Sequence, residues 1–111
     1  MTSIQAGELN KRIALSRPEE VRNNFGESKT QIVKVTDVWA KAEAMSNRKI
    51  RTADQQQVIE TYHFTIRPRS DIDEGWIIAY QKRNFTVRAL DRNQLDRLII
   101  TAEVDSRHDR N

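Results

Sequence analysis

Two histidines are the only side chains of this sequence that ordinarily serve as a general base near neutral pH. His63 lies in an alternating run between Thr61 and Thr65, and His108 belongs to a charged stretch near the last residue. Nucleophilic catalysis needs a serine, cysteine or threonine held beside such a base, and no local motif pairs either histidine with one. We therefore interpret His63 as a solvent-facing strand residue and predict no catalytic residue.

Acidic side chains gather most closely at Asp71, Asp73 and Glu74. A calcium-binding loop alternates its ligands around a central glycine, and this pattern is missing. Residues 70–75 are instead typical of a turn between two strands, in which Gly75 supplies a flexible backbone. The sequence has no cysteine for a thiolate metal site, and its 3 glycines are too far apart to form a phosphate-binding loop. We predict no metal and no cofactor.

Basic side chains that could contact phosphate lie in two groups: Arg48, Lys49 and Arg51 in the first, and Arg67 and Arg69 in the second. Tyr62 and Phe64 are close to the second group, as in proteins that stack nucleic-acid bases on aromatic rings. Side chains alternate across a strand, however, so both rings share a face with Ile66 and lie opposite Arg67. We therefore interpret Tyr62 and Phe64 as core residues.

The chain has 111 residues, of which 37% are hydrophobic and 32% charged, which suits one modest core beneath a heavily charged surface. The net charge of +3 comes from interspersed residues of both signs and does not by itself indicate a nucleic-acid-binding protein. The lack of cysteine fits folding in a reducing cytoplasm. No apolar run approaches the roughly 20 residues that span a bilayer. We expect a single cytoplasmic domain without a membrane partner.

Short segments in which apolar and polar residues alternate predict half-buried β-strands. Six strands are expected, at residues 12–17, 32–45, 59–68, 76–80, 83–90 and 97–104. About six antiparallel strands protect their edges best by closing into a small barrel. We therefore predict an all-β fold that is either a barrel or a sandwich. A helix is the alternative for the alanine-rich residues 38–45.

The alternation also predicts which side chains face the interior. Ala40, Ala42 and Ala44 are expected on the inner face of the second strand, and Ala89 on the inner face of the fifth. The predicted core consists of Trp39, Tyr62, Phe64, Ile66, Phe85, Val87 and Ile100.

Two polar segments do not fit the strand pattern. Residues 18–29 are rich in turn formers, and we interpret them as a long, mobile hairpin connection. Residues 46–57 begin at Ser46, which suits a helix N-cap, but they have almost no apolar stripe. We expect this second segment to be largely disordered in the isolated chain, with one short helix as the alternative. The termini, residues 1–10 and 105–111, are expected to be flexible.

Four segments together resemble a known family. Residues 6–15 (Ala-Gly-Glu-Leu-Asn-Lys-Arg-Ile-Ala-Leu) resemble the Gly-Glu-Leu-Arg-x-Arg-Ile start of the phage head-tail adaptor, or head-tail joining, family. Residues 38–43 (Val-Trp-Ala-Lys-Ala-Glu), 62–72 and 85–91 resemble its later strands in the same order. The resemblance covers residues 7–103. Asn10 and Pro68 depart from the commoner residues of the family.

The resemblance implies a structural, non-enzymatic function over a single head-tail joining domain. Family members form a β-barrel ring beneath the portal that closes the DNA-filled head and presents a docking surface for the tail. The implied partners are further copies of the chain, portal or adaptor proteins, tail terminator proteins and, through non-specific contact, genomic DNA in the channel. The implied location is the host cytoplasm during assembly and the head-tail junction of the virion.

The resemblance also implies which residues make contacts. The segment that matches the channel-facing loop of the family is residues 46–57, so Arg48, Lys49 and Arg51 would lie near DNA. The predicted interface residues are Glu19, Glu20, Asn23, Phe25, Ile50, Gln55 and Gln56.

Two other classes of function compete with this interpretation. A small barrel that binds single-stranded nucleic acid would show saturable binding that weakens steeply as salt rises. A small enzyme would need a catalytic constellation assembled from residues distant in the sequence, and only the folded chain tests that hypothesis.

Overall fold

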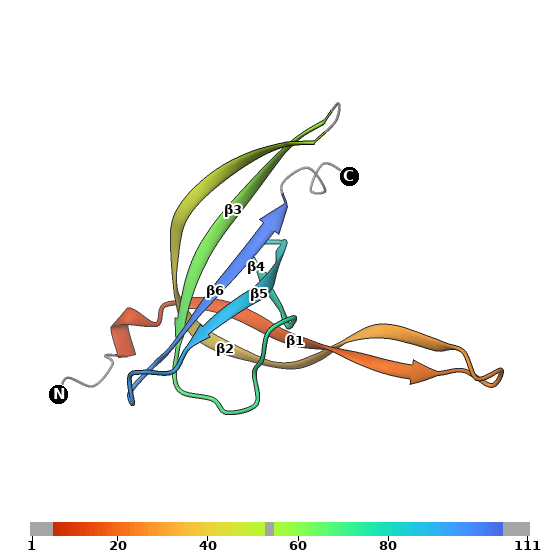
Figure 1. Cartoon of the computed structure of the whole chain (residues 1–111). Helices are drawn as coiled ribbons and strands as arrows, with labels where there is room; N and C mark the ends of the chain where they lie inside the picture. Colours follow the sequence, from red (N-terminus) through yellow and green to blue (C-terminus); the bar gives the residue numbers. More distant parts are fainter. Residues whose placement is uncertain (1–5, 53–54, 106–111) are drawn as a thin grey trace.

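Six antiparallel strands make up most of the computed structural model, which describes residues 6–52 and 55–105 (Figure 1). In chain order the elements are η1 (Ala6–Glu8), β1 (Lys11–Arg22), β2 (Ser28–Thr52), β3 (Gln55–Ile66), β4 (Ile77–Tyr80), β5 (Arg83–Asp91) and β6 (Leu98–Asp105). The strands hydrogen-bond in the closed order β1-β2-β3-β6-β5-β4. The predicted all-β fold of about six strands is confirmed, and the choice between barrel and sandwich is decided in favour of a barrel.

Aromatic rings from three strands fill the middle of the barrel. The Phe64 ring of β3 lies 5.2 Å from Phe85 of β5 and 5.6 Å from Tyr80 of β4, centroid to centroid, and both pairs are edge to face. Tyr62 lies 4.9 Å from Phe85. Such pairs contribute about 0.5–1.5 kcal/mol beyond the burial of their area, so this cluster ties β3 to β4 and β5.

The predicted core residues are buried or half-buried, with one exception. Those that are fully buried are Phe64, Ile66, Phe85, Val87 and Ile100, and Tyr62 is half-buried. Trp39 was wrongly assigned to the core, since it is 52% exposed. It lies on the outward face of β2, next to the buried Ala40, and the Arg12 guanidinium covers its ring at 5.2 Å.

A β-bulge in β5 explains a second difference from the simple alternation. Val87 pairs with Ala102 and Ala89 pairs with Thr101, so Arg88 is the extra residue on β5. A bulge reverses the faces of the residues that follow it. Ala89 is consequently exposed, and Leu90 packs against the core in its place.

The first hairpin is far more regular than the mobile connection predicted for residues 18–29. β1 continues to Arg22 and β2 starts at Ser28, so only residues 23–27 connect them. β1 pairs with β4 only through Ala14, Leu15 and Ser16. Beyond these residues the β1–β2 hairpin is a two-stranded ribbon, which leaves the barrel as the first arm, residues 17–33 (Figure 1).

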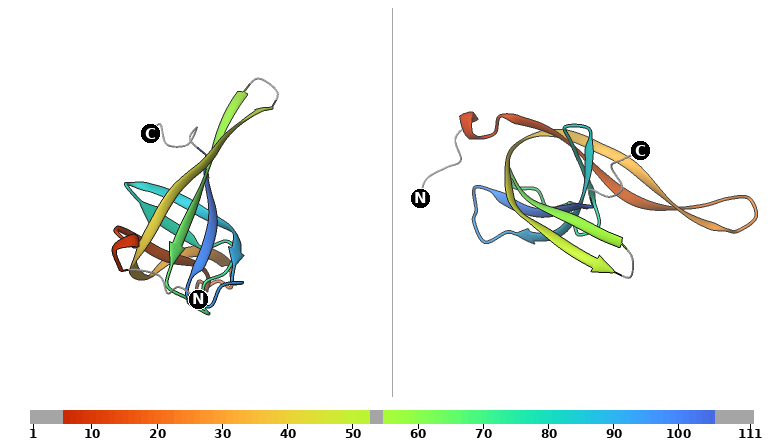
Figure 2. Two further views of the ribbon diagram at one scale, coloured as in Figure 1. Left: turned by 90° about the vertical axis from the view of Figure 1, so that its left-hand side faces the viewer. Right: turned by 90° about the horizontal axis from the view of Figure 1, so that it is seen from above.

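The second hairpin also corrects a prediction. Residues 46–52 and 55–57 are strand and form neither a disordered loop nor a helix capped by Ser46, because β2 runs to Thr52 and β3 starts at Gln55. The ladder between β3 and β6 begins at Ile59. Residues 49–52 and 55–58 therefore form a second two-stranded ribbon, the second arm, and Figures 1 and 2 show that the two arms leave the barrel in different directions. In each arm, two strands that already pair in the barrel continue to pair beyond it. This pairing overrides the preference of the polar local sequence for a loop or a helix.

β2 also explains the graded burial of its alanines. Ala40 is buried and Ala42 half-buried, as expected for the inner face, but Ala44 is exposed because the strand is already leaving the barrel there. The alternative of a helix over residues 38–45 is wrong.

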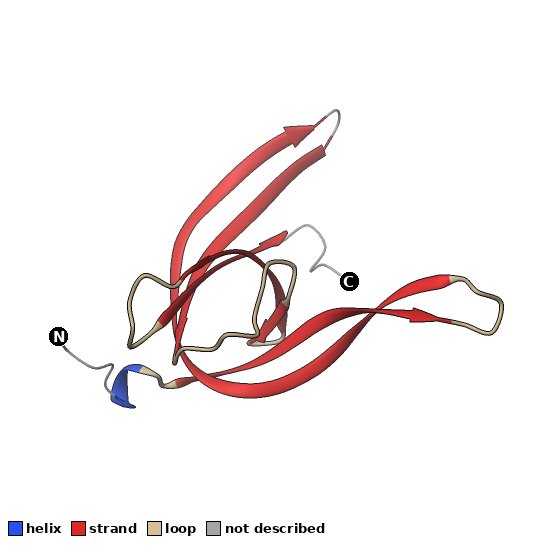
Figure 3. Cartoon of the chain, turned by 60° about the horizontal axis from the view of Figure 1, so that its bottom comes forward, coloured by secondary structure: helices blue, strands red, loops and turns tan. Residues whose placement is uncertain are grey.

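One residue before β1 is buried in the barrel. η1, the helix shown in blue in Figure 3, precedes Leu9, which is only 6% exposed. The flexibility of residues 1–10 stays a prediction, and Leu9 within that segment is a buried residue. Residues 1–5, 53–54 and 106–111, which include His108, lie outside the described part of the chain.

The turn between β4 and β5 has an unusual composition. It consists of Gln81 and Lys82, whose φ angles are 52° and 64°. Two consecutive left-handed residues form a type I′ turn, which ordinarily contains Asn-Gly. The sequence did not reveal the turn type because neither residue is typical of it.

The aromatic cluster generates the first prediction. Phe64→Ala should lower the free energy of unfolding by about 3–5 kcal/mol, because it opens a cavity at a fully buried site. Phe25→Ala is the matched control, since Phe25 is 87% exposed, and should change stability by less than about 0.5 kcal/mol. Chemical denaturation of both variants measures the difference, and equal losses would contradict the packing described for Phe64.

The turn between β4 and β5 leads to the second prediction. Replacing Gln81 with Asn and Lys82 with Gly should raise the free energy of unfolding by about 1 kcal/mol, because left-handed backbone strains most other residues by about 1–2 kcal/mol each. Gly26→Ala, at a φ of 82°, is the control of opposite sign and should destabilise. Thermal unfolding measures both, and a loss of stability in the Asn-Gly variant would contradict the turn assignment.

Candidate interaction surface

The tip of the first arm is an ordered turn that presents one aromatic ring to solvent. The Asn23 side-chain oxygen accepts hydrogen bonds from the backbone N–H groups of Phe25 (2.9 Å) and Glu27 (3.0 Å). The Asn23 backbone oxygen accepts a third from Gly26 at 3.2 Å. Gly26 takes a left-handed conformation that costs other residues strain. The Phe25 ring is thus held outward, 87% exposed, by a turn of fixed geometry.

The remaining predicted interface residues divide between the two arms. Glu19, Glu20 and Asn23 are exposed on the first arm, where Arg17 forms an ion pair with Glu19 at 3.7 Å. The arm also exposes the apolar side chains of Val21 and Ile32. Isolated two-stranded hairpins are marginally stable in water, so this apolar surface favours coverage by a partner.

The predicted DNA-facing residues lie on or beside the second arm. Lys49 and Arg51 belong to its β2 side, and Arg48 lies at its base, opposite Ile59. Ile50, Gln55 and Gln56 share the arm, but the side chains of residues 46–58 lie outside the described part of the structure. The sequence therefore identified this arm as one unit while mistaking its backbone conformation.

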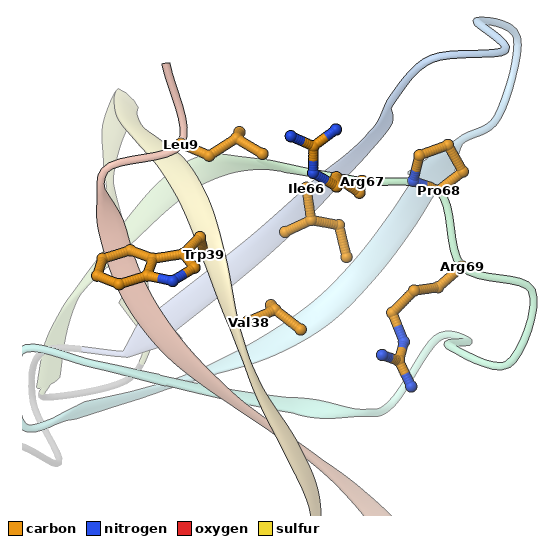
Figure 4. Close-up of a pocket in the computed structure, with 7 residues that line it drawn as sticks. All are labelled: Leu9, Val38, Trp39, Ile66, Arg67, Pro68 and Arg69. Carbon is orange, nitrogen blue, oxygen red and sulfur yellow. The ribbon is translucent and has the colours of Figure 1, made fainter. Parts of the chain in front are cut away.

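A pocket of about 310 Å³ opens at the end of the barrel where the chain enters it (Figure 4). Leu9, Val38 and Ile66 form its middle, Trp39 lies to one side and Arg69 to the other. Its lining is completed by Arg67 and Pro68. Sequence reasoning missed this site, because its residues come from three segments that only the barrel brings together.

The pocket exists because the ladder between β2 and β3 stops there. The last pair of that ladder is Lys41 with Thr65. In a continued ladder, the residues after Ile66 would lie opposite Trp39 and Val38. Pro68 has no backbone N–H to donate and restricts the residue before it. The ladder thus ends just before Arg67 and Pro68, and Leu9, Val38 and Ile66 line the apolar gap that is left.

Arg67 and Arg69 give the pocket a positive rim, and of these two only Arg69 is held by an ion pair among the residues that the structure describes. Arg69 donates two hydrogen bonds to Asp71, at 2.8 and 3.0 Å, and these bonds lower the pKa of the Asp71 carboxyl below its ordinary value. Arg92 fixes this connection by donating to the backbone oxygens of Arg69 and Ile72. Arg67 is exposed and makes no ion pair within residues 6–52 and 55–105. The charge of Arg67 is therefore available to a partner.

The acidic residues of segment 70–75 form the predicted turn. The Glu74 backbone N–H donates to the Asp73 side chain at 2.8 Å, and Gly75 has a φ of 91°. The described residues contain no group of three acidic, histidine or cysteine side chains that could hold a metal ion. His63 lies on the outward face of β3, opposite Glu43 and Thr101 in the register, and does not line the pocket.

Base stacking by Tyr62 and Phe64 is not supported by their positions. Phe64 is completely buried, and the Tyr62 ring packs against Phe64 and Phe85 inside the barrel. Within the described residues, no helix has the length and apolar composition needed to cross a membrane.

Comparisons with known proteins agree with this architecture. A chain in the virion of a native gene transfer agent particle has a similar fold, with a TM-score of 0.70 and 16% identity over 87% of this chain and 94% of that one. A Shigella flexneri 2a protein determined in solution is similar with a TM-score of 0.68 and 19% identity, over 89% and 95% of the two chains. No curated protein matches significantly.

At such low identity these structures establish the fold alone, and the family comes from the sequence. The model of the phage head completion protein family matches residues 4–105. That match spans both arms, the pocket and every strand of the barrel. The chain therefore belongs to the phage head completion protein family and is a structural protein of the phage head.

Proposed function

We propose that the chain forms a homo-oligomeric ring beneath the portal, closes the DNA-filled head and presents the docking surface for the tail. In this function its neighbours are other copies, a portal or adaptor protein on one side and a tail terminator protein on the other. The chain assembles in the host cytoplasm and remains at the head-tail junction of the virion. Its contribution is binding, without a catalytic step.

The observation that carries this proposal is the pair of arms on a closed barrel. A barrel that needs only its own core to fold has no structural use for two ribbons that project away from that core. Ribbons of this kind become stable when other chains cover them. Arms that leave in different directions, as Figure 2 shows, suit a subunit that contacts several neighbours at once.

The numbers of basic and acidic residues differ between the two arms, which supports different binding partners for them. Residues 17–33 of the first arm carry three basic and three acidic residues, a balance that suits contact with protein. Residues 46–58 of the second hairpin carry Arg48, Lys49 and Arg51 against the single acid Asp54. We assign the second arm to the DNA channel, where non-specific contacts to phosphate need basic side chains and no base readout.

The function is tested by completing heads in vitro. Heads made by the encoding phage genome without this protein should be tailless and leak DNA, and adding the purified chain should yield DNA-retaining heads that accept tails. Electron microscopy and nuclease protection measure both outcomes. Heads that stay leaky and tailless after addition would contradict the function, and addition of buffer alone serves as the negative control.

The channel assignment gives a separate prediction. Changing Arg48, Lys49 and Arg51 together to Ala should leave particles assembled but make retained DNA more sensitive to added salt and to nuclease, because three phosphate contacts per subunit are lost. Changing Arg17, Arg22 and Lys29 of the first arm to Ala removes the same charge and is the matched control. Equal DNA loss from both variants would contradict the channel assignment.

A further inference from the structure

The chain carries a projecting aromatic side chain and a separate pocket that could receive one. Phe25 is the most exposed large apolar side chain among the described residues, and its turn is fixed by three hydrogen bonds to Asn23. The pocket at Leu9 has an apolar middle and a volume of about 310 Å³, which is sufficient for a phenyl ring. A pre-ordered aromatic anchor facing an apolar pocket is the usual form of an interface hot spot.

The two features cannot meet within one molecule. Leu9 precedes β1 and Phe25 follows it, and β1 has 12 residues. An extended strand rises about 3.3 Å per residue, so the pocket and the ring lie roughly 40 Å apart. Figure 1 shows η1 and the first arm on opposite sides of the barrel. A contact between them must therefore join two copies.

One carboxylate near the Phe25 ring and one arginine at the pocket rim have complementary charges. Arg67 stands at the pocket rim without an ion pair among the described residues. Glu27 is exposed two residues beyond Phe25 and likewise makes no ion pair in the described part of the chain. When the ring enters the pocket, this carboxylate comes to the rim where Arg67 is available. The adjacent Arg69 is already engaged with Asp71 and serves to shape the rim.

We infer that Phe25 of one copy inserts into the pocket of Leu9, Val38, Ile66 and Pro68 on the next copy, with Glu27 pairing to Arg67. This contact uses two different surfaces of the chain, so it is head to tail. Head-to-tail contacts propagate, and they close into a ring when the rotation between copies permits. The inference deepens the proposed function by naming the ring contact, and it rests on that function only for the closure of the ring.

Disulfide trapping tests the contact directly, because the chain has no cysteine of its own. Asn24→Cys lies beside Phe25, and Asn10→Cys lies beside Leu9, so both leave the ring and the pocket lining intact. The two variants are mixed at high concentration under a mild oxidant, and the mixed dimer is measured on a non-reducing gel. Asn84→Cys, exposed on β5 away from the pocket, replaces Asn10→Cys in the control mixture.

The expected result is a mixed dimer from Asn24→Cys with Asn10→Cys that exceeds the control mixture. Adding Phe25→Ala to the Asn24→Cys chain should reduce its yield by about tenfold, as loss of an aromatic anchor does. Arg67→Glu should also reduce it, and Glu27→Arg in the partner copy should restore it. A yield equal to the control, or one unchanged by Phe25→Ala, would overturn the inference.

Heads distinguish this failure from failure of the proposed function. If the chain completes heads but the Asn24→Cys/Asn10→Cys double variant forms no cross-linked multimers in them, the function stands and this contact is wrong. If the cysteine at position 24 cross-links instead to a portal or tail protein, the first arm docks on that partner, and the inference is again overturned. If the purified chain completes no heads, the function itself is wrong, whatever the cross-linking in solution shows.

Discussion

The barrel depends on one strand that changes its partner halfway along. β2 pairs with β1 up to Ala40 and with β3 from Lys41, so it joins the two halves of the sheet through the ladders on either side of this point. Closure on the far side rests on the short ladder between β1 and β4 around Leu15. β2 has 25 residues, and at about 3.3 Å per residue it is longer than the barrel needs. The arms are the ends of this strand, each paired with a neighbour.

Bulges set where each arm leaves. In the β1–β2 ladder the extra residue is Val35, and in the β2–β3 ladder it is Met45. A bulge bends its strand and increases the local twist. Both bulges lie on β2, close to the residues at which β4 and β6 stop pairing with the neighbouring strands. The point of departure of an arm is thus built into the ladder that carries it, without a flexible linker.

Closing the barrel restricts where binding can occur. Strands that are paired on both sides have no backbone groups left for hydrogen bonds to a partner. Contacts with other chains are therefore expected at the projecting arms and at the place where a ladder ends early. The ladder between β2 and β3 ends in this way at Lys41 and Thr65, and the gap beyond that pair becomes the pocket. The Asp71 carboxylate holds Arg69, whereas Arg67 remains exposed at the rim. The same short stretch of chain after β3 therefore creates the cavity and gives it a charge.

The sequence by itself determined the strands of the barrel and most of the core, because the alternation of side chains along a strand is a local property. Phe64, Ile66 and Ile100 were identified in this way, and Pro68 was visible as a departure from the family pattern. It did not determine the face of Ala89, which is reversed by a bulge, and the assignment of Trp39 to the core disagreed with the same alternation, which places the neighbouring Ala40 inside. The extended backbone of residues 46–52 and 55–57 and the pocket around Leu9 were decided only by the tertiary structure. Both arise from contacts between segments that are distant in the sequence. The local sequence of a polar hairpin, or of a single leucine, does not indicate which distant segment will lie next to it.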